Sequence, residues 1–285
     1  MFRKVISLAL FGANTRYAVY AGSVVRAYRT LFPDAEIWVH HDADLDSTAG
    51  GRVLRRVAER GIVRLVAMVE APLTAAMLWR VHPIWEPGVD FVFARDIDAL
   101  PTPRERYCVD RFVVSGMILH TVHDSSSHDG IIGGLSGFEA EGFRARTGLA
   151  SLDDLYQLAS FSREKWATHG TDQDALNGKI APRLWGHVFE HMYDGWRDGH
   201  PGPRPDPRRE TKYLGLAEYV PDEVVFPGRV AAWTCAADAL VPHMGAAGHD
   251  YEGASRFYDR EGDPGEMTIV REAEEAEGVF PGAAP

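Results

Sequence analysis

The chain has 285 residues, of which 45% are apolar and 25% charged, ordinary globular proportions that allow a sizeable buried core. Its formal net charge of −11 argues against a general electrostatic hold on nucleic acid or on anionic membrane. The two cysteines, Cys108 and Cys235, are far apart and form no C-x-x-C motif, which favours a reducing compartment over a disulfide framework.

The N-terminal stretch joins Arg3 and Lys4 to a short apolar run, as the start of a secretory signal does. The run leads directly into a polar turn and a helical pattern, so we expect a first buried strand instead. No stretch reaches the length of a membrane span. We therefore expect a cytoplasmic protein without membrane insertion.

Apolar runs alternate with segments of helical spacing through the first hundred residues. The expected strands are 5–11, 36–40, 62–68 and the run Phe91–Phe93, and the expected helices are 17–31, 47–60 (capped by Ser47) and 73–85. This order predicts βαβ units and a mostly parallel sheet covered on both faces. Ligands of such sheets bind beyond the carboxyl ends of the strands.

After Leu100 the alternation becomes irregular. We expect helices at 103–114, 152–159 and 172–180, strands at 116–122, 184–189, 224–226 and 230–235, and loops at 124–137 and 198–212. Because the sequence has no internal repeat, we expect a single domain over residues 1–260, and the acidic composition predicts a solvated tail over 261–285.

Asp96 and Asp98 follow the fourth apolar run. If the strand continues, residues i and i+2 share a face and the two carboxylates lie side by side. Close carboxylates repel each other unless a cation or a proton lies between them. A hard divalent ion, Mn²⁺ or Mg²⁺, fits oxygen ligands and keeps positions open for substrate phosphates. The alternative is a polar turn with two solvated aspartates.

Several common motifs are missing. The first strand is followed by neither Gly-x-Gly-x-x-Gly nor a Walker loop, which disfavours a dinucleotide dehydrogenase and a P-loop protein. Gly134–Gly137 resembles a nucleophile elbow only in part, because Phe138 stands where the second glycine belongs. We therefore reject a serine hydrolase.

His120, Asp124 and His128 are spaced four residues apart, so on a helix they would share a face able to hold zinc. Gly130 and three serines favour a loop instead, with histidines that are satisfied locally. A metal-dependent hydrolase that uses these three residues stays an alternative function.

Two later stretches are also informative. The adjacent glycines Gly133 and Gly134 allow positive φ and close approach of the backbone to a ligand, although a tight turn explains them equally well. Thr171 is a candidate helix cap, with Asp172 in the first turn. Capping does not explain the Gln173 that follows.

Taken together, four features resemble GT-A-fold, DxD-containing glycosyltransferases, nearest to the retaining galactosyltransferase and glycogenin-like group, as a divergent subgroup. They are Met77–Arg80, Arg95–Asp98 after an apolar strand, Gly133-Gly134, and DQDALN at 172–177. The resemblance covers roughly residues 5 to 245. It implies an α/β fold with a Rossmann-type, mostly parallel sheet and an irregular α+β C-terminal half. Residues 1–100 would be the nucleotide-sugar-binding half and 101–260 the acceptor-side half.

The resemblance implies a metal-dependent hexosyltransferase that moves a sugar from a nucleotide-diphosphate sugar, with a UDP-sugar favoured, to a hydroxyl acceptor. The acceptor can be a glycan, a protein, a small molecule or a modified nucleic-acid base. A non-catalytic nucleotide-binding protein of the same fold is a further alternative. A nucleotidyltransferase is the weakest one, because the stretch after the first strand holds a single glycine.

The resemblance also assigns roles to residues. The metal ligands would be Asp96, Asp98 and His243, and the residues lining the nucleoside pocket would be Phe11, Gly12, Asn14 and Tyr17. Arg80, Asp96, Gly133 and Gly134 would complete the donor site, with Arg95 either there or in a structural ion pair. Asp172 would hold sugar hydroxyls and Gln173 would lie near the anomeric carbon. In a retaining reaction the leaving phosphate can act as base; Asp124 is the candidate base if the reaction inverts.

Overall fold

The computed structural model describes residues 2–12, 15–42, 45–46, 48–68, 73–99, 101, 103–123, 130–159, 170–192 and 213–219. Within these residues, the strands are β1 (Lys4–Leu10), β2 (Glu36–His41), β3 (Arg64–Ala67), β4 (Phe91–Arg95), β5 (Leu119–His123), β6 (Leu135–Glu139), β7 (Val188–Met192) and β8 (Leu216–Tyr219). The helices are α1 (Thr15–Leu31), α2 (Ala49–Glu59), α3 (Pro103–Val113), α4 (Ala140–Thr147), α5 (Leu152–Ala159) and α6 (Thr171–Ala175). Three segments have other helical geometry: η2 (Leu73–Trp85) and η5 (Ala181–Leu184) are 3₁₀, and η4 (Leu176–Ile180) is π.

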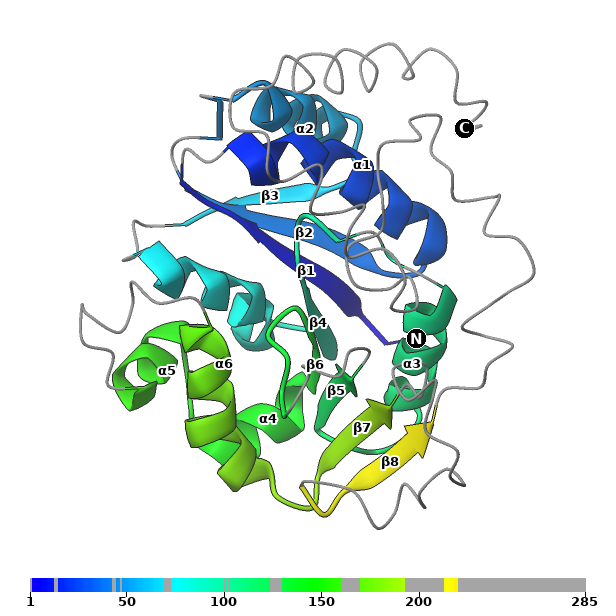
Figure 1. Cartoon of the computed structure of the whole chain (residues 1–285), viewed down its shortest axis with the longest axis vertical. Helices are drawn as coiled ribbons and strands as arrows, with labels where there is room; N and C mark the ends of the chain where they lie inside the picture. Colours follow the sequence, from blue (N-terminus) through cyan, green and yellow to red (C-terminus); the bar gives the residue numbers. More distant parts are fainter. Residues whose placement is uncertain are drawn as a thin grey trace, which may run out of the picture.

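Within the described part of the chain, the strands form one sheet in the order β3-β2-β1-β4-β6-β5-β7-β8 (Figure 1). β6 is antiparallel to both of its neighbours, and every other adjacent pair is parallel. The expected α/β class with a mostly parallel sheet is therefore confirmed.

Helices cover both faces of the sheet, because side chains alternate along each strand. Ile6 and Leu8 of β1 pack with residues of α1, α2 and α3 on one face. Val5 of β1 and Val92 of β4 pack with residues of η2, α4 and α5 on the other. In Figure 1, α1 and α2 lie on one side of the sheet and α4, α5 and α6 on the opposite side.

Several expected element boundaries are wrong in detail. The N-cap of α2 is Thr48 and not Ser47: the Thr48 hydroxyl accepts the N–H of Gly51 at 3.0 Å. The segment 73–85 is helical as expected, but as a 3₁₀ helix, and it contains Pro83, which has no N–H to donate.

The second half differs more from expectation. The expected loop 124–137 contains the start of β6, and neither α4 nor β8 was expected. The strand expected at 116–122 lies at Leu119–His123, and the one expected at 184–189 lies at Val188–Met192. The strands expected at 224–226 and 230–235, the loop 198–212 and the tail 261–285 fall outside the described residues.

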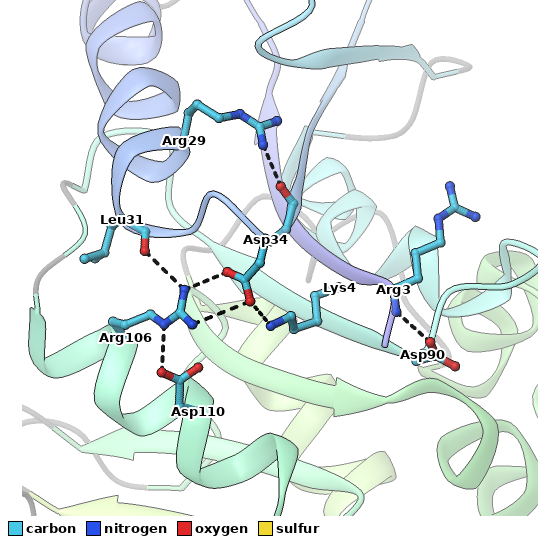
Figure 2. A network of polar contacts seen from close by, with 9 residues as sticks. Arg3, Lys4, Arg29, Leu31, Asp34, Asp90, Arg106 and Asp110 are labelled. Atoms are coloured by element: carbon cyan, nitrogen blue, oxygen red, sulfur yellow. Dashed lines mark hydrogen bonds and ion pairs between the residues drawn. The ribbon is translucent and has the colours of Figure 1, made fainter. Parts of the chain in front are cut away.

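A polar network ties the first strand and two helices together near the start of β1 (Figure 2). Asp34, just after α1, pairs with Lys4 of β1 and accepts a bond of 2.7 Å from Arg106 of α3. Arg106 also pairs with Asp110 at 2.8 Å. Burial alone would raise the pKa of Asp34, but Lys4 and Arg106 lower it to about 2. This network fixes the end of the sheet opposite to the carboxyl ends of the strands.

Among the described helices, none has both the length and the apolar character that crossing a membrane requires.

Candidate functional site

The candidate site lies at the carboxyl ends of the parallel strands. Because β6 runs opposite to β4, the start of β6 lies beside the end of β4, and Leu135 pairs with Arg95. The residues just after β4 and just before β6, Asp96 and Gly134, therefore meet. A Cβ atom on Gly134 would overlap the carboxylate of Asp96. The reversal of one strand thus brings Gly134 against the carboxylate of Asp96.

The guanidinium of Arg80, on η2, joins two aspartates from distant parts of the chain. Its Nη2 donates to Asp172 Oδ2 at 2.8 Å, its Nη1 pairs with Asp96, and its Nε donates to the carbonyl of Met77 at 2.9 Å. Arg80 is 4% exposed and Asp172 is 2% exposed. Burial lowers the pKa of Arg80, but Asp96 and Asp172 outweigh it and raise the pKa above its ordinary value. We call Arg80, Asp96 and Asp172 the charge cluster.

The glycine turn, Gly133 and Gly134, packs directly on the charge cluster. A Cβ atom on Gly133 would overlap Asp172 Oδ2 and come within 3.1 Å of Arg80 Nη2. Glycine is therefore required here because other side chains lie so close. A tight turn alone would not require such close neighbours. The other carboxylate oxygen, Asp172 Oδ1, is buried and has no hydrogen-bond partner among the described residues. A buried acceptor of this kind is costly unless a partner such as a ligand hydroxyl satisfies it.

Asp96 and Asp98 do not lie on a continued strand, and that expectation is wrong. β4 ends at Arg95, and residues 97 and 98 form a turn in which the N–H of Ala99 contacts the carbonyl of Asp96 at 3.3 Å. Both aspartates are partly exposed. Their two carboxylates suit Mn²⁺ or Mg²⁺, which proteins often hold by one or two carboxylates plus phosphate oxygens. The described residues contain no group of three metal-ligating side chains, and His243 lies outside them.

Arg95 has surroundings of a different kind. It is 1% exposed, pairs with Glu105 of α3 and donates to the carbonyl of Ser136 at 2.7 Å. It shares the α3 face of β4 with Phe93, while the charge cluster lies on the η2 side. These contacts favour the structural ion pair for Arg95, which was the expected alternative to binding the donor.

The ends of β1 and β2 form the neighbouring part of the same edge. Phe11 makes an edge-to-face contact with Trp79, with ring centroids 5.8 Å apart. Gly12 has φ of +75° and donates its N–H to Asp42 Oδ2. Tyr17 lies partly buried in the first turns of α1, and Asn14 lies outside the described residues. Asp42 is a site residue that was not predicted, although its place directly after a strand of the parallel sheet was an available signal.

Helix α6 begins differently from expectation. Its N-cap is Gly170, with φ of +88°, and no side chain caps the helix. Thr171 is buried inside the first turn, so its expected capping role is wrong. Asp172 accepts from Arg80, and Gln173 beside it is partly buried.

Of the proposed hydrolase triad, the described residues include His120 alone. His120 lies fully buried on β5, with its Nε2 2.8 Å from His191 Nδ1 and its ring stacked on Phe112. Burial, with a further contribution from His191, lowers the pKa of His120 well below its ordinary value. Asp124 and His128 lie outside the described residues. The surroundings of His120 do not favour hydrolytic metal chemistry.

No family model matches this chain. The search of curated proteins also found no significant match. Among solved structures, the chain resembles the galactosyltransferase LgtC in complex with donor and acceptor sugar analogues (14% identity, 97% of this chain and 100% of that chain, TM-score 0.44). It also resembles the mannosyltransferase PcManGT from Pyrobaculum calidifontis in complex with GDP-Man and Mn²⁺ (13% identity, 96% of this chain and 69% of that chain, TM-score 0.41). A third match is 4-diphosphocytidyl-2C-methyl-D-erythritol synthase from Anaerococcus prevotii (11% identity, 61% of this chain and 82% of that chain, TM-score 0.39). Similarity at this level carries no inference about activity.

Proposed function

We propose that this chain is a metal-dependent glycosyltransferase that moves a sugar from a nucleotide-diphosphate sugar, with a UDP-sugar favoured, to a hydroxyl acceptor. One observation supports this most: the Arg80 guanidinium is shared between Asp96 and Asp172, against a glycine turn at the carboxyl edge of the sheet. Open α/β sheets bind their ligands at this edge. The ends of β1 and β2 lie beside it and would hold the nucleoside, with Phe11, Gly12, Asn14 and Tyr17 as its proposed contacts.

Asp172 is the proposed anchor for the donor sugar. Its Oδ1 is a buried acceptor with no partner among the described residues, so a sugar hydroxyl can donate to it. Arg80 is the counter-ion of this buried carboxylate and leaves its Oδ1 able to accept. Because Gly133 and Gly134 have no side chains, the surface beside the sugar would be formed by their backbone.

Departure of the diphosphate leaves negative charge on its oxygens. Asp96 and Asp98, with His243, are the proposed ligands of Mn²⁺ or Mg²⁺, which when bound supplies Lewis-acid stabilisation of that charge. Asp96 would then be shared between the ion and Arg80, whose guanidinium is also suited to phosphate. Gln173 is proposed to lie at the reacting face of the anomeric carbon. In a retaining reaction a leaving phosphate oxygen accepts the acceptor's proton; in an inverting one we propose Asp124 as base.

A thermal-shift screen with UDP-, GDP- and CDP-sugars, with and without Mn²⁺, tests the proposal. A ligand that binds the native state alone raises its stability, so we expect one nucleotide class to raise the Tm and Mn²⁺ to enlarge the rise. The same nucleotide sugar should be slowly hydrolysed in the absence of acceptor. A shift without turnover of any sugar would favour a non-catalytic binding protein. No shift and no hydrolysis with any donor would contradict the proposal.

A further inference from the structure

We infer that Asn177 is a positioning residue that sets the distance between the glycine turn and Asp172, and thereby the fit of the donor sugar. The inference rests on the proposed function for its consequence in catalysis. Its structural basis is a set of contacts that no part of the proposed chemistry uses.

The carboxamide of Asn177 holds the backbone just before the glycine turn. Its Oδ1 accepts the N–H of Ile131 at 2.8 Å, and its Nδ2 donates to the carbonyl of Ile131 at 2.9 Å. Nδ2 also donates to the carbonyl of Gln173 at 2.8 Å, and Oδ1 accepts from the hydroxyl of Tyr213 at 2.6 Å. Two donated and two accepted bonds use the full capacity of a primary amide. Asn177 is therefore held in one orientation.

The local backbone is shaped around this contact. Asn177 lies in the π-helical segment η4, directly after α6, and π turns occur frequently at functional sites. Opposite it, Gly130 has φ of +84°, and a Cβ atom there would overlap Asn177 Oδ1. The π-helical segment η4 and the backbone at Gly130 thus both depart from regular geometry where they meet.

Asn177 couples the turn to the helix that carries Asp172. On the β5 side, Thr121 donates to the carbonyl of Gly130 at 3.1 Å and accepts the N–H of Ile132 at 3.2 Å. These bonds fix the turn to the sheet. Asn177, five residues after Asp172 on the continuous segment α6–η4, fixes it to the charge cluster. Loss of the carboxamide would let the turn move relative to Asp172 while the sheet stays in place.

The expected consequence is specific to the sugar. The glycine turn faces Asp172 and Asp96, whereas the proposed nucleoside pocket lies at the ends of β1 and β2. A misplacement of about 1 Å beside the reacting centre can cost about 100-fold in rate. We therefore expect Asn177→Ala to lower kcat for nucleotide-sugar hydrolysis by about 100-fold, with the Kd of the nucleoside diphosphate, measured calorimetrically with Mn²⁺, unchanged.

Two more variants and a control sharpen the test. Asn177→Asp keeps the acceptor for Ile131 but loses both donated bonds, and Tyr213→Phe loses one accepted bond; we expect intermediate falls in kcat. Ser115→Ala is the matched control, because the Ser115 hydroxyl likewise makes two backbone bonds, to Phe112 at 2.8 Å and Met117 at 3.0 Å, in the turn after α3. Its kcat should match that of the wild type.

Hydrogen exchange separates this inference from the proposed function. In Asn177→Ala the amides of residues 131–134 should exchange faster than in the wild type, and in Ser115→Ala they should not. Unchanged exchange in Asn177→Ala would overturn the inference even if the enzyme proves to be a transferase. Equal losses of nucleotide affinity and kcat would mean a merely structural role. If the wild type neither binds nor hydrolyses any nucleotide sugar, the proposed function fails, and the exchange result still decides the positioning role.

Discussion

Arg80 is the residue on which the charge cluster depends, and its chemistry explains why an arginine is found there. A guanidinium presents several donors in a fixed plane, so one side chain can bind Asp96, Asp172 and a backbone carbonyl at once. Lysine would offer a single point charge at this position. Removal of Arg80 would leave the carboxylate of Asp172, 2% exposed, without its counter-ion.

We expect Arg80→Met to lower the free energy of unfolding by about 3–5 kcal/mol, because breaking one side of a buried ion pair leaves an uncompensated charge. Adding Asp172→Asn to Arg80→Met removes that charge and should restore part of the loss. Urea denaturation of the wild type, the single variant and the double variant measures both effects. A single variant as stable as the wild type would show that solvent or another group compensates Asp172.

Asp98, which lies partly exposed in the turn after β4, tests the proposed metal role. We expect Asp98→Asn to remain folded and to lose metal-dependent turnover of the nucleotide sugar, because an amide is a poorer ligand for a hard cation. Circular dichroism checks the fold, and Mn²⁺ titration followed by electron paramagnetic resonance checks binding. Undiminished turnover with unchanged Mn²⁺ affinity would contradict the metal role of this residue.

At the scale of elements, β6 shows where local pattern stops being informative. Its sequence, LSGFE, holds a buried Ser136 and a glycine, which are weak strand formers. Gly137 is required because a Cβ atom there would lie 2.8 Å from the ring of Phe93, a contact between strands that the sequence does not encode locally. The antiparallel direction of β6 relative to β4 and β5 likewise depends on the whole sheet and cannot be predicted from the local sequence.

The site was predictable to the extent that its residues carry side-chain chemistry. The resemblance to glycosyltransferases singles out Arg80, Asp96 and Asp172, and the charge cluster joins these three residues. Asn177 and Asp42 act on backbone groups, and no residue spacing predicts which backbone they contact. The strand expected to continue through Asp96 and Asp98 instead ends at Arg95, and residues 97 and 98 form a turn.

The glycine turn permits a direct comparison between two glycines. We expect Gly134→Ala to abolish detectable binding of the nucleotide sugar, because its methyl group would overlap the Asp96 carboxylate and displace it from Arg80. Gly178→Ala in η4 is the control: nothing lies within 4 Å of its added Cβ, so it should be neutral or stabilise the protein by about 0.5 kcal/mol. Calorimetric titration and thermal unfolding measure both variants. Gly134→Ala with wild-type affinity would separate the turn from the donor site.

At the scale of the whole molecule, three buried histidines on the described strands have lowered pKa values. Burial, with a smaller contribution from His82, lowers the pKa of His40 on β2 to about 3. Burial also lowers the pKa of His191 on β7 to about 3, although Glu218 acts in the opposite direction. His120 on β5 is shifted the same way. Neutrality of these side chains is therefore a condition of the folded sheet.

This condition predicts acid sensitivity. Above about pH 6.5 the histidines are neutral in both states, so they add no pH dependence; below it the unfolded chain binds protons that the folded chain does not, and stability falls. Between pH 6.5 and 5 each should cost about 2 kcal/mol. Urea denaturation at pH 7.5, 6 and 5 should show the loss of unfolding free energy. His191→Gln should reduce the slope of that free energy against pH by the equivalent of about one bound proton. Equal stability at pH 7.5 and 5 would show that these histidines are protonated, or reached by solvent, in the folded protein.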